Sequence, residues 1–156
     1  MMTRKVTKII TLTIIGQILL ILLFAIFICF NDILLGSMTW SFKNGIRRSD
    51  AAVELLEVEN ICGKLNGNGN GMNYLGAALV KAGSDQVMDA LVADLSSDFD
   101  TLGYTVVDGK QLEIPYLEHG NISFDDTELQ DGETYYCVYF YVHEHPASNI
   151  FDIRGY

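Results

Sequence analysis

The sequence predicts an α+β protein: an N-terminal transmembrane helix with a helical extension, then a small antiparallel β-sheet domain. Three observations lead to this prediction. An uncharged apolar run lies near the N-terminus, helical periodicity follows it, and a strand pattern rich in aromatic residues comes late in the chain. The 156 residues suffice for one anchor and one domain with a core of its own.

The run from Ile9 to Asn31 holds 23 residues without a charge. As a helix it would be about 34 Å long, against roughly 30 Å of bilayer hydrocarbon. Gln17, in mid-span, is either a tolerated polar residue or a contact to another membrane helix. Basic residues precede the run, and no Asp or Glu occurs before Asp32. We therefore expect a single-pass cell-membrane protein with a cytoplasmic N-terminus and an extracytoplasmic C-terminal domain.

Three kinds of N-terminal processing signal fit this run poorly. A cleavable signal peptide has about 7–15 apolar residues and a small-x-small cleavage site, whereas this run is longer and lacks such a site. A lipoprotein signal needs a small residue before the lipidated cysteine, but Ile28 precedes Cys29. A pilin-type leader would cut after Gly16, and the fifth residue of the product would be Ile21 rather than the usual Glu. We expect the helix to be retained as an uncleaved anchor.

The helix is expected to continue beyond the membrane, with weak points at Gly36 or Asn44–Gly45. Trp40 and Phe42 either form an interfacial aromatic belt or pack on the domain. Ser49 and Asp50 are suitable N-cap residues for a further helical stretch. Apolar residues then recur at intervals of four and three, as on one face of a helix: Ala51, Leu55, Val58, Cys62 and Leu65. We interpret this stripe as domain core.

These patterns divide the chain into four segments. They are a cytoplasmic tail (1–8), a transmembrane helix (9–31), a juxtamembrane helical segment (32–65) and an extracytoplasmic α+β domain (66–156).

The domain is expected to mix one helix with several strands. Residues 66–71 alternate Asn and Gly and predict a loop, and Asn73–Ala82 fits either a helix or a buried strand. Ser84–Asp85 caps an amphipathic helix that extends to Phe99.

The later part of the chain predicts strands. Asp108–Gly109 indicates a tight turn between strands Tyr104–Val107 and Gln111–Ile114. Both faces of Thr134–His143 are apolar or aromatic, so we expect a central strand covered by the helix on one side. Ile150–Ile153 is a candidate last strand. The strands are expected to form an antiparallel meander.

Charge is segregated along the chain. Three of the 10 basic residues precede the apolar run, so the rest carries 7 basic against 20 acidic residues, a formal charge of −13. So acidic a domain repels nucleic acids and anionic lipid headgroups, and no nucleic-acid partner is expected.

The cysteines offer one candidate crosslink. Cys62 and Cys137 are both predicted outside the cytoplasm, where a disulfide would join the juxtamembrane segment to the sheet. The alternative is two buried thiols. Cys29 lies in the membrane as an apolar filler.

No catalytic, cofactor or metal site is predicted. His143 and His145 could point the same way from a strand, but a metal needs further ligands and His119 is the only other histidine. An acidic cluster does not have EF-hand spacing and is interpreted as a solvated turn: Asp125, Asp126, Glu128, Asp131 and Glu133. No serine lies in a Gly-x-Ser-x-Gly elbow, and we expect a non-enzymatic protein.

The arrangement of segments resembles pilin-like and pseudopilin-like proteins, in particular membrane proteins of Gram-positive Tad or type II secretion clusters. Two segments carry the resemblance: AAVELLEVENICGKL (Ala51–Leu65) and the aromatic strand followed by NIFDIRGY (Asn149–Tyr156). The resemblance implies a membrane-anchored, non-enzymatic component of a cell-envelope assembly or secretion apparatus. Its partners would be the lipid bilayer and other envelope or pilus-like proteins, contacted through the N-terminal helix. The alternative function is a surface-displayed ligand-binding or sensing module.

Overall fold

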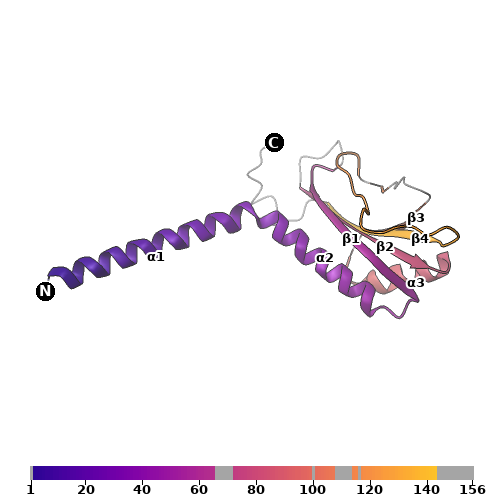
Figure 1. Cartoon of the computed structure of the whole chain (residues 1–156), viewed down its shortest axis with the longest axis horizontal. Helices are drawn as coiled ribbons and strands as arrows, with labels where there is room; N and C mark the ends of the chain where they lie inside the picture. The colour runs from indigo at the N-terminus through magenta and orange to yellow at the C-terminus, as the bar shows by residue number, and fades with distance from the viewer. Residues whose placement is uncertain (1, 66–71, 100, 108–113, 116, 144–156) are drawn as a thin grey trace.

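The computed structural model describes residues 2–65, 72–99, 101–107, 114–115 and 117–143. Two N-terminal helices lead into a four-stranded antiparallel sheet with the strand order β1-β2-β4-β3 (Figure 1). A third helix follows β2 in the sequence. The predicted α+β class, with an apolar helix, a helical extension and a small antiparallel sheet, is confirmed.

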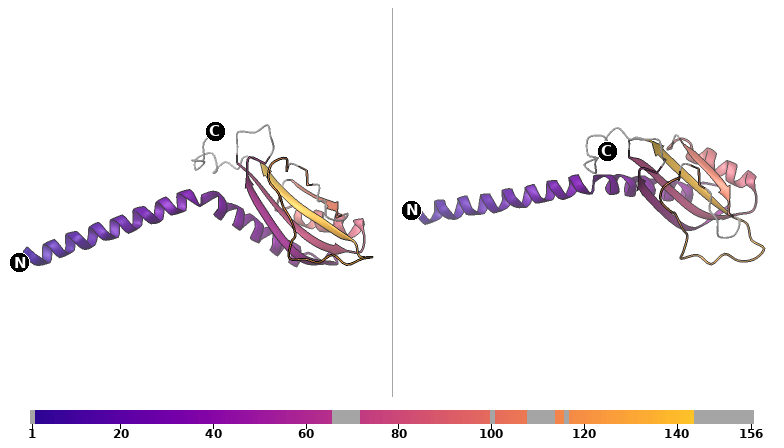
Figure 2. Two further views of the ribbon diagram at one scale, coloured as in Figure 1. Left: turned by 45° about the horizontal axis from the view of Figure 1, so that its top comes forward. Right: turned by 90° about the horizontal axis from the view of Figure 1, so that it is seen from above.

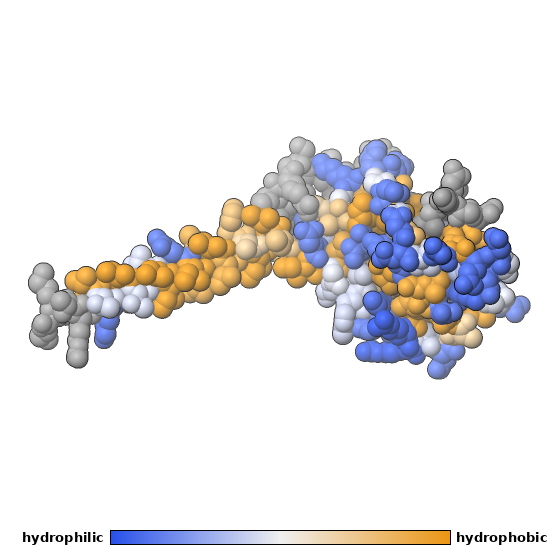
Figure 3. Space-filling view, viewed as in Figure 1, coloured by the Kyte–Doolittle hydropathy of each residue, from blue (hydrophilic) through white to orange (hydrophobic). Residues whose placement is uncertain are grey.

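The first helix, α1 (Met2–Ile28), stands clear of the domain. Within the described residues it is the one helix long and apolar enough, by length and composition, to cross a membrane, and its span is Val6–Ile28. None of that span is buried in the protein. Figure 3 shows apolar surface covering most of α1 as far as the domain.

A bend at Cys29 separates α1 from α2 (Phe30–Arg48). The backbone hydrogen bonds continue across it: the Cys29 N–H donates to Ala25 O at 3.0 Å, and the Ile33 N–H donates to Cys29 O at 2.9 Å. The chain therefore changes direction without a linker, as the further views in Figure 2 also show. The predicted weak points were wrong, because α2 runs through both Gly36 and Asn44–Gly45.

One face of α2 packs against the sheet. Its buried residues recur at helical intervals: Asn31, Leu35, Thr39, Phe42 and Ile46. Phe42 is fully buried, so it packs on the domain, whereas Trp40 is 67% exposed. The helical extension is thus part of the domain's core.

The helix predicted over Ala51–Leu65 is wrong. The chain becomes extended at Ser49, and β1 spans Val53–Gly63. A register shift between Leu55 and Glu57 inserts an extra residue into the strand. The apolar residues on one face are therefore spaced by three across the bulge and by even numbers elsewhere, which imitates a helical stripe. The juxtamembrane segment 32–65 is helical only as far as Arg48.

The remaining strands complete the sheet. β2 (Asn73–Ala82) pairs with β1 on one side and with β4 (Tyr135–His143) on the other, and β3 (Leu102–Val106) pairs with the far side of β4. The ambiguous segment is thus a strand, and β4 is central as predicted. Because β3 lies beyond β4, the order departs from a simple meander.

Other predictions are met in part. Helix α3 (Asp85–Leu95) begins after Ser84 as expected but ends before Phe99. The partner of β3 is β4, and Ile114 is not in a strand. The predicted loop 66–71, the turn Asp108–Gly109 and the strand Ile150–Ile153 lie outside the described residues.

The sheet has an apolar core on each face. Helices α2 and α3 cover one face, where Phe140 of β4 stacks on Phe99 with ring centroids 4.8 Å apart and meets Phe42 edge-on at 5.1 Å. Residues of the irregular segment before β4, including Ile114 and Ile122, cover the other face. Because successive side chains of β4 point to opposite faces of the sheet, β4 contributes residues to both cores.

Candidate functional site

The joint between α2 and the sheet is built from buried polar contacts. Asn31, in the first turn of α2, is 3% exposed and accepts a hydrogen bond of 2.7 Å from the Tyr74 hydroxyl on β2. The neighbouring Asp32 Oδ1 accepts a hydrogen bond of 3.5 Å from the Cys62 thiol on β1. The end of the sheet therefore holds the start of α2, immediately after the bend.

A second polar pair lies at the same end of the sheet. Asn73 and His143 are register partners on β2 and β4, and Asn73 Oδ1 lies 2.7 Å from His143 Nδ1. Asn73 is fully buried, so this contact contributes to satisfying its side chain. His143 is therefore engaged in a structural pair.

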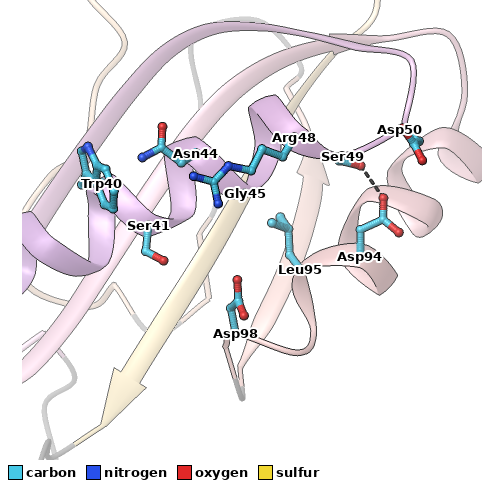
Figure 4. Close-up of a pocket in the computed structure, with 10 residues that line it drawn as sticks. All are labelled: Trp40, Ser41, Asn44, Gly45, Arg48, Ser49, Asp50, Asp94, Leu95 and Asp98. Carbon is cyan, nitrogen blue, oxygen red and sulfur yellow. Dashed lines mark hydrogen bonds between the residues drawn. The ribbon is translucent and has the colours of Figure 1, made fainter.

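At the opposite end of α2, its last turns and the last turn of α3 enclose an open groove of about 340 Å³. Its lining is Trp40, Ser41, Asn44, Gly45, Arg48, Ser49, Asp50, Asp94, Leu95 and Asp98 (Figure 4). Trp40, Asn44 and Arg48 project from successive turns of α2, and the acidic residues Asp94 and Asp98 come from α3 and the turn after it.

One polar contact in the groove joins the end of α2 to α3. The Ser49 hydroxyl donates to Asp94 Oδ2 at 2.5 Å and accepts from the Ala51 N–H at 3.1 Å. Leu95 packs so closely on Gly45 that a side chain there would overlap it. The lining contains no His or Cys, and its titratable side chains are Arg48, Asp50, Asp94 and Asp98.

The structure does not pair the two candidate disulfide cysteines. None of the three cysteines, Cys29, Cys62 and Cys137, is in a disulfide. Cys62 packs with the helix-covered core and Cys137 with the opposite one. β2 lies between their strands, and the register offset adds about 17 Å along the strand direction, far beyond disulfide geometry.

The candidate metal ligands also stay apart. No group of three or more His, Cys, Asp or Glu in the described part of the chain is placed to hold a metal ion. His145 lies outside that part. In the acidic segment, Glu133 pairs with Lys81 at 2.9 Å, and Glu57 of β1 accepts from the Thr127 hydroxyl at 2.8 Å. These contacts hold the segment against the sheet.

Two tyrosine–aspartate hydrogen bonds were not predicted from the sequence. Tyr104 donates to Asp89 Oδ1 at 2.9 Å, and Tyr136 donates to Asp85 Oδ1 at 2.8 Å. The hydrogen bond to Asp89, with a smaller contribution from burial, raises the pKa of Tyr104 to about 12. Asp85 and Asp89 lie in the first turns of α3, and the strand partners that reach them depend on the sheet order.

No protein-family model, curated protein or solved structure matches the chain.

Proposed function

We propose that the protein is a single-pass, membrane-anchored, non-enzymatic component of a cell-envelope assembly or secretion apparatus, pilin-like in form. Its N-terminus would lie in the cytoplasm and its sheet domain outside. One observation carries the proposal: an exposed apolar helix, α1, continues without a linker into a helix that forms part of the domain's core.

That continuity supports a structural subunit rather than a tethered domain. A tether needs only a flexible connection between anchor and domain. Here Leu35, Phe42 and Ile46 are at most 5% exposed, so the membrane helix is fixed to the sheet through α2. Subunits that pack through their membrane helices while displaying a domain at a set angle require such a connection.

The same continuity supports retention of the anchor. Cleavage just beyond the apolar span would fall in unbroken helix, where the Ile33 N–H bonds to Cys29 O. The core residue Asn31 follows within three residues of Ile28. Signal peptidases cut after a small-x-small pattern, and residues 26–33 contain no such pattern.

The pilin-like form is supported by the arrangement of elements. A long N-terminal helical unit leaves its first half exposed and packs its second half across a four-stranded antiparallel sheet (Figure 1). Of the two segments that suggested the resemblance, Ala51–Leu65 is largely strand and Asn149–Tyr156 lies outside the described residues. The proposal therefore rests on architecture.

Mid-span residues of α1 suit contact with other membrane helices. Gly16 has no neighbouring atom that an added side chain would meet, so a second backbone could approach closely. Gln17 is adjacent and can donate or accept a hydrogen bond within the bilayer.

In-cell photocrosslinking tests the proposal. A photoreactive residue replaces Gln17 in the full chain, and a matched variant carries it at Ile9, near the membrane edge. We expect a discrete protein adduct from position 17 that is weaker from position 9. If positions along the whole of α1 give lipid adducts alone, the assembly proposal is wrong.

Cysteine labelling tests the topology. With the native cysteines replaced by alanine, Asp50→Cys should react with an impermeant maleimide in intact cells. Thr3→Cys should react only after permeabilisation. The reverse pattern would overturn the proposed orientation.

The alternative, a surface-displayed ligand-binding or sensing module, is favoured by the groove that includes the exposed Trp40. If the protein is such a module, the Trp40→Ala variant should bind the ligand more weakly than the wild type. The protein crosslinks from α1 should then be absent.

A further inference from the structure

We propose that the outer face of α2 rests on the anionic headgroup surface of the bilayer that α1 crosses. This face comprises Ile33, Trp40, Arg47 and Arg48, and the half-exposed Lys43 lies at its edge. The inference rests on the proposed function in one respect, namely that α1 is a membrane span. It adds a lipid partner for α2 and a defined orientation for the domain.

Two large apolar residues of this face are exposed. Ile33 and Trp40 are two turns apart and lie opposite the buried face, with 56% and 67% of their surfaces exposed. Tryptophan has an apolar body and one polar N–H, which favours the boundary between hydrocarbon and water. Trp40 lies ten residues beyond Phe30, the first residue of α2.

The charges of this face complement anionic lipid. α2 contains Lys43, Arg47 and Arg48 but a single acidic residue, Asp32. From Ser49 onward the chain has 4 basic and 19 acidic residues. Three of the seven basic residues that follow the apolar run are thus in α2, while Asp50, Asp94 and Asp98 line the groove beside Trp40 and Arg48.

The three cations are available for such contacts. In the described part of the chain, none of the three forms a salt bridge, whereas Lys81 pairs with Glu133. Favourable interaction with the C-terminal end of the helix dipole explains Arg47 and Arg48. It does not explain the exposed Trp40 and Ile33 on the same side of the helix.

The bend places this face toward the membrane. The sheet lies on one side of α2, and the bend inclines the opposite side back toward α1 (Figures 1 and 2). Trp40 is about 15 Å along α2 from the bend, and the inclination makes its height above the hydrocarbon smaller than that. A headgroup layer is about 5–7 Å thick per leaflet, and long basic side chains extend the reach of the face.

Trp40 is itself a reporter, because the chain has one tryptophan. The full-length protein is reconstituted into phosphatidylcholine vesicles with and without phosphatidylglycerol. Quenching of Trp40 is then measured with aqueous acrylamide and with lipids brominated at shallow or deep positions. We expect shallow-lipid quenching and protection from acrylamide, both stronger with phosphatidylglycerol and weaker at high salt.

Charge variants provide the matched comparison. Arg47→Gln should lower the ratio of docked to undocked α2 about fivefold, because a basic residue near an anionic surface contributes on the order of 1 kcal/mol. Lys81→Gln removes the same charge from the sheet and should leave the quenching unchanged.

Vesicle flotation separates this inference from the proposed function. Failure of the chain to float with the vesicles after carbonate washing would refute the membrane span itself. Flotation with Trp40 open to acrylamide and unaffected by brominated lipids would overturn the docking of α2 alone. Protection of Trp40 that grows with protein concentration and not with phosphatidylglycerol would assign this face to a protein contact, and would likewise overturn it.

Discussion

Two tyrosine hydroxyls hold the start of α3 on the sheet. Tyr104 of β3 and Tyr136 of β4 donate to Asp89 and Asp85, which lie one turn apart on the helix. The two rings also meet edge-on at 5.8 Å. A hydroxyl that donates to a carboxylate is held in its neutral form, so the contact depends on pH at the alkaline end.

This dependence gives a prediction with a definite sign. The pKa of Tyr104 is raised to about 12 from an ordinary value of about 10, chiefly by the hydrogen bond to Asp89. The stabilisation is therefore complete below pH 10 and is lost as the pH rises through 12. We expect the unfolding free energy of the full chain in detergent micelles to fall over that range, and to fall less steeply in Tyr104→Phe.

Denaturant titrations followed by circular dichroism at several pH values measure this slope. Burial raises the pKa of Cys137 to about 12 as well, so the variant should retain some alkaline loss. Tyr135→Phe is the control, because the Tyr135 hydroxyl accepts from the Gln130 N–H instead of donating to a carboxylate. Equal slopes for Tyr104→Phe and wild type would contradict the assignment.

The two cysteines of the folded domain should differ in reactivity. Cys137 is fully buried and burial raises its pKa, so little thiolate is present at neutral pH. Cys62 is partly exposed at the end of β1. We expect a mass-tagged maleimide to modify Cys62 in the native protein and Cys137 only in denaturant. A Cys62–Cys137 crosslink in non-reduced protein would show the arrangement of strands to be wrong.

At the scale of elements, the pairing of β2 with β4 includes a glycine that lies directly against an aromatic ring. Gly76 is the register partner of Phe140, and a Cβ at Gly76 would overlap the Phe140 ring. Gly103 of β3 lies in the same way against Tyr139. The Phe140 ring cannot easily move aside, because it packs between Phe42 and Phe99.

Gly76→Ala should therefore destabilise the domain by about 1–3 kcal/mol, as expected for an overpacked core. Gly36→Ala in α2 is the matched control, since an added Cβ there meets no atom within 4 Å. It should be neutral or stabilise by up to about 1 kcal/mol through helix propensity. Denaturation midpoints of the two variants compare them directly, and equal midpoints would refute the packing argument.

The elements that sequence patterns predicted are those with regular periodicity. The apolar run, α3 and the two-faced strand β4 follow directly from spacing and capping. The nature of β1 could not be derived, because the bulge near Leu55 converts strand alternation into apparent helical spacing. The bend at Cys29 has no glycine or proline to signal it, and becomes understandable only once Asn31 is seen bonded to Tyr74.

The candidate surface was predictable only in part. Trp40 and Phe42 are two residues apart and looked equivalent, yet one is exposed and the other buried. Their difference follows from the direction in which α2 meets the sheet, which is a tertiary feature. The concentration of basic residues in α2 is visible in the sequence, but its significance depends on where the helix ends at Arg48.

At the scale of the whole molecule, the apolar helix α1 and the domain form one connected unit with two distinct surfaces. α1 leaves its apolar side chains exposed, whereas α2 has its apolar face buried. Packing against the sheet therefore fixes α2 but not α1, although the backbone hydrogen bonds of the two helices are continuous. Two truncated chains test the contribution of α1 and that of α2 separately.

A chain starting at Cys29 should fold as a soluble domain, because it loses α1 and keeps every buried residue of α2. A chain starting at Ser49 should aggregate, because it exposes the sheet face that Phe42 and Ile46 cover. Size-exclusion chromatography and denaturation midpoints distinguish the two outcomes. If the shorter chain is monomeric and equally stable, α2 is only a linker, and the rigid coupling that supports the structural-subunit proposal is lost.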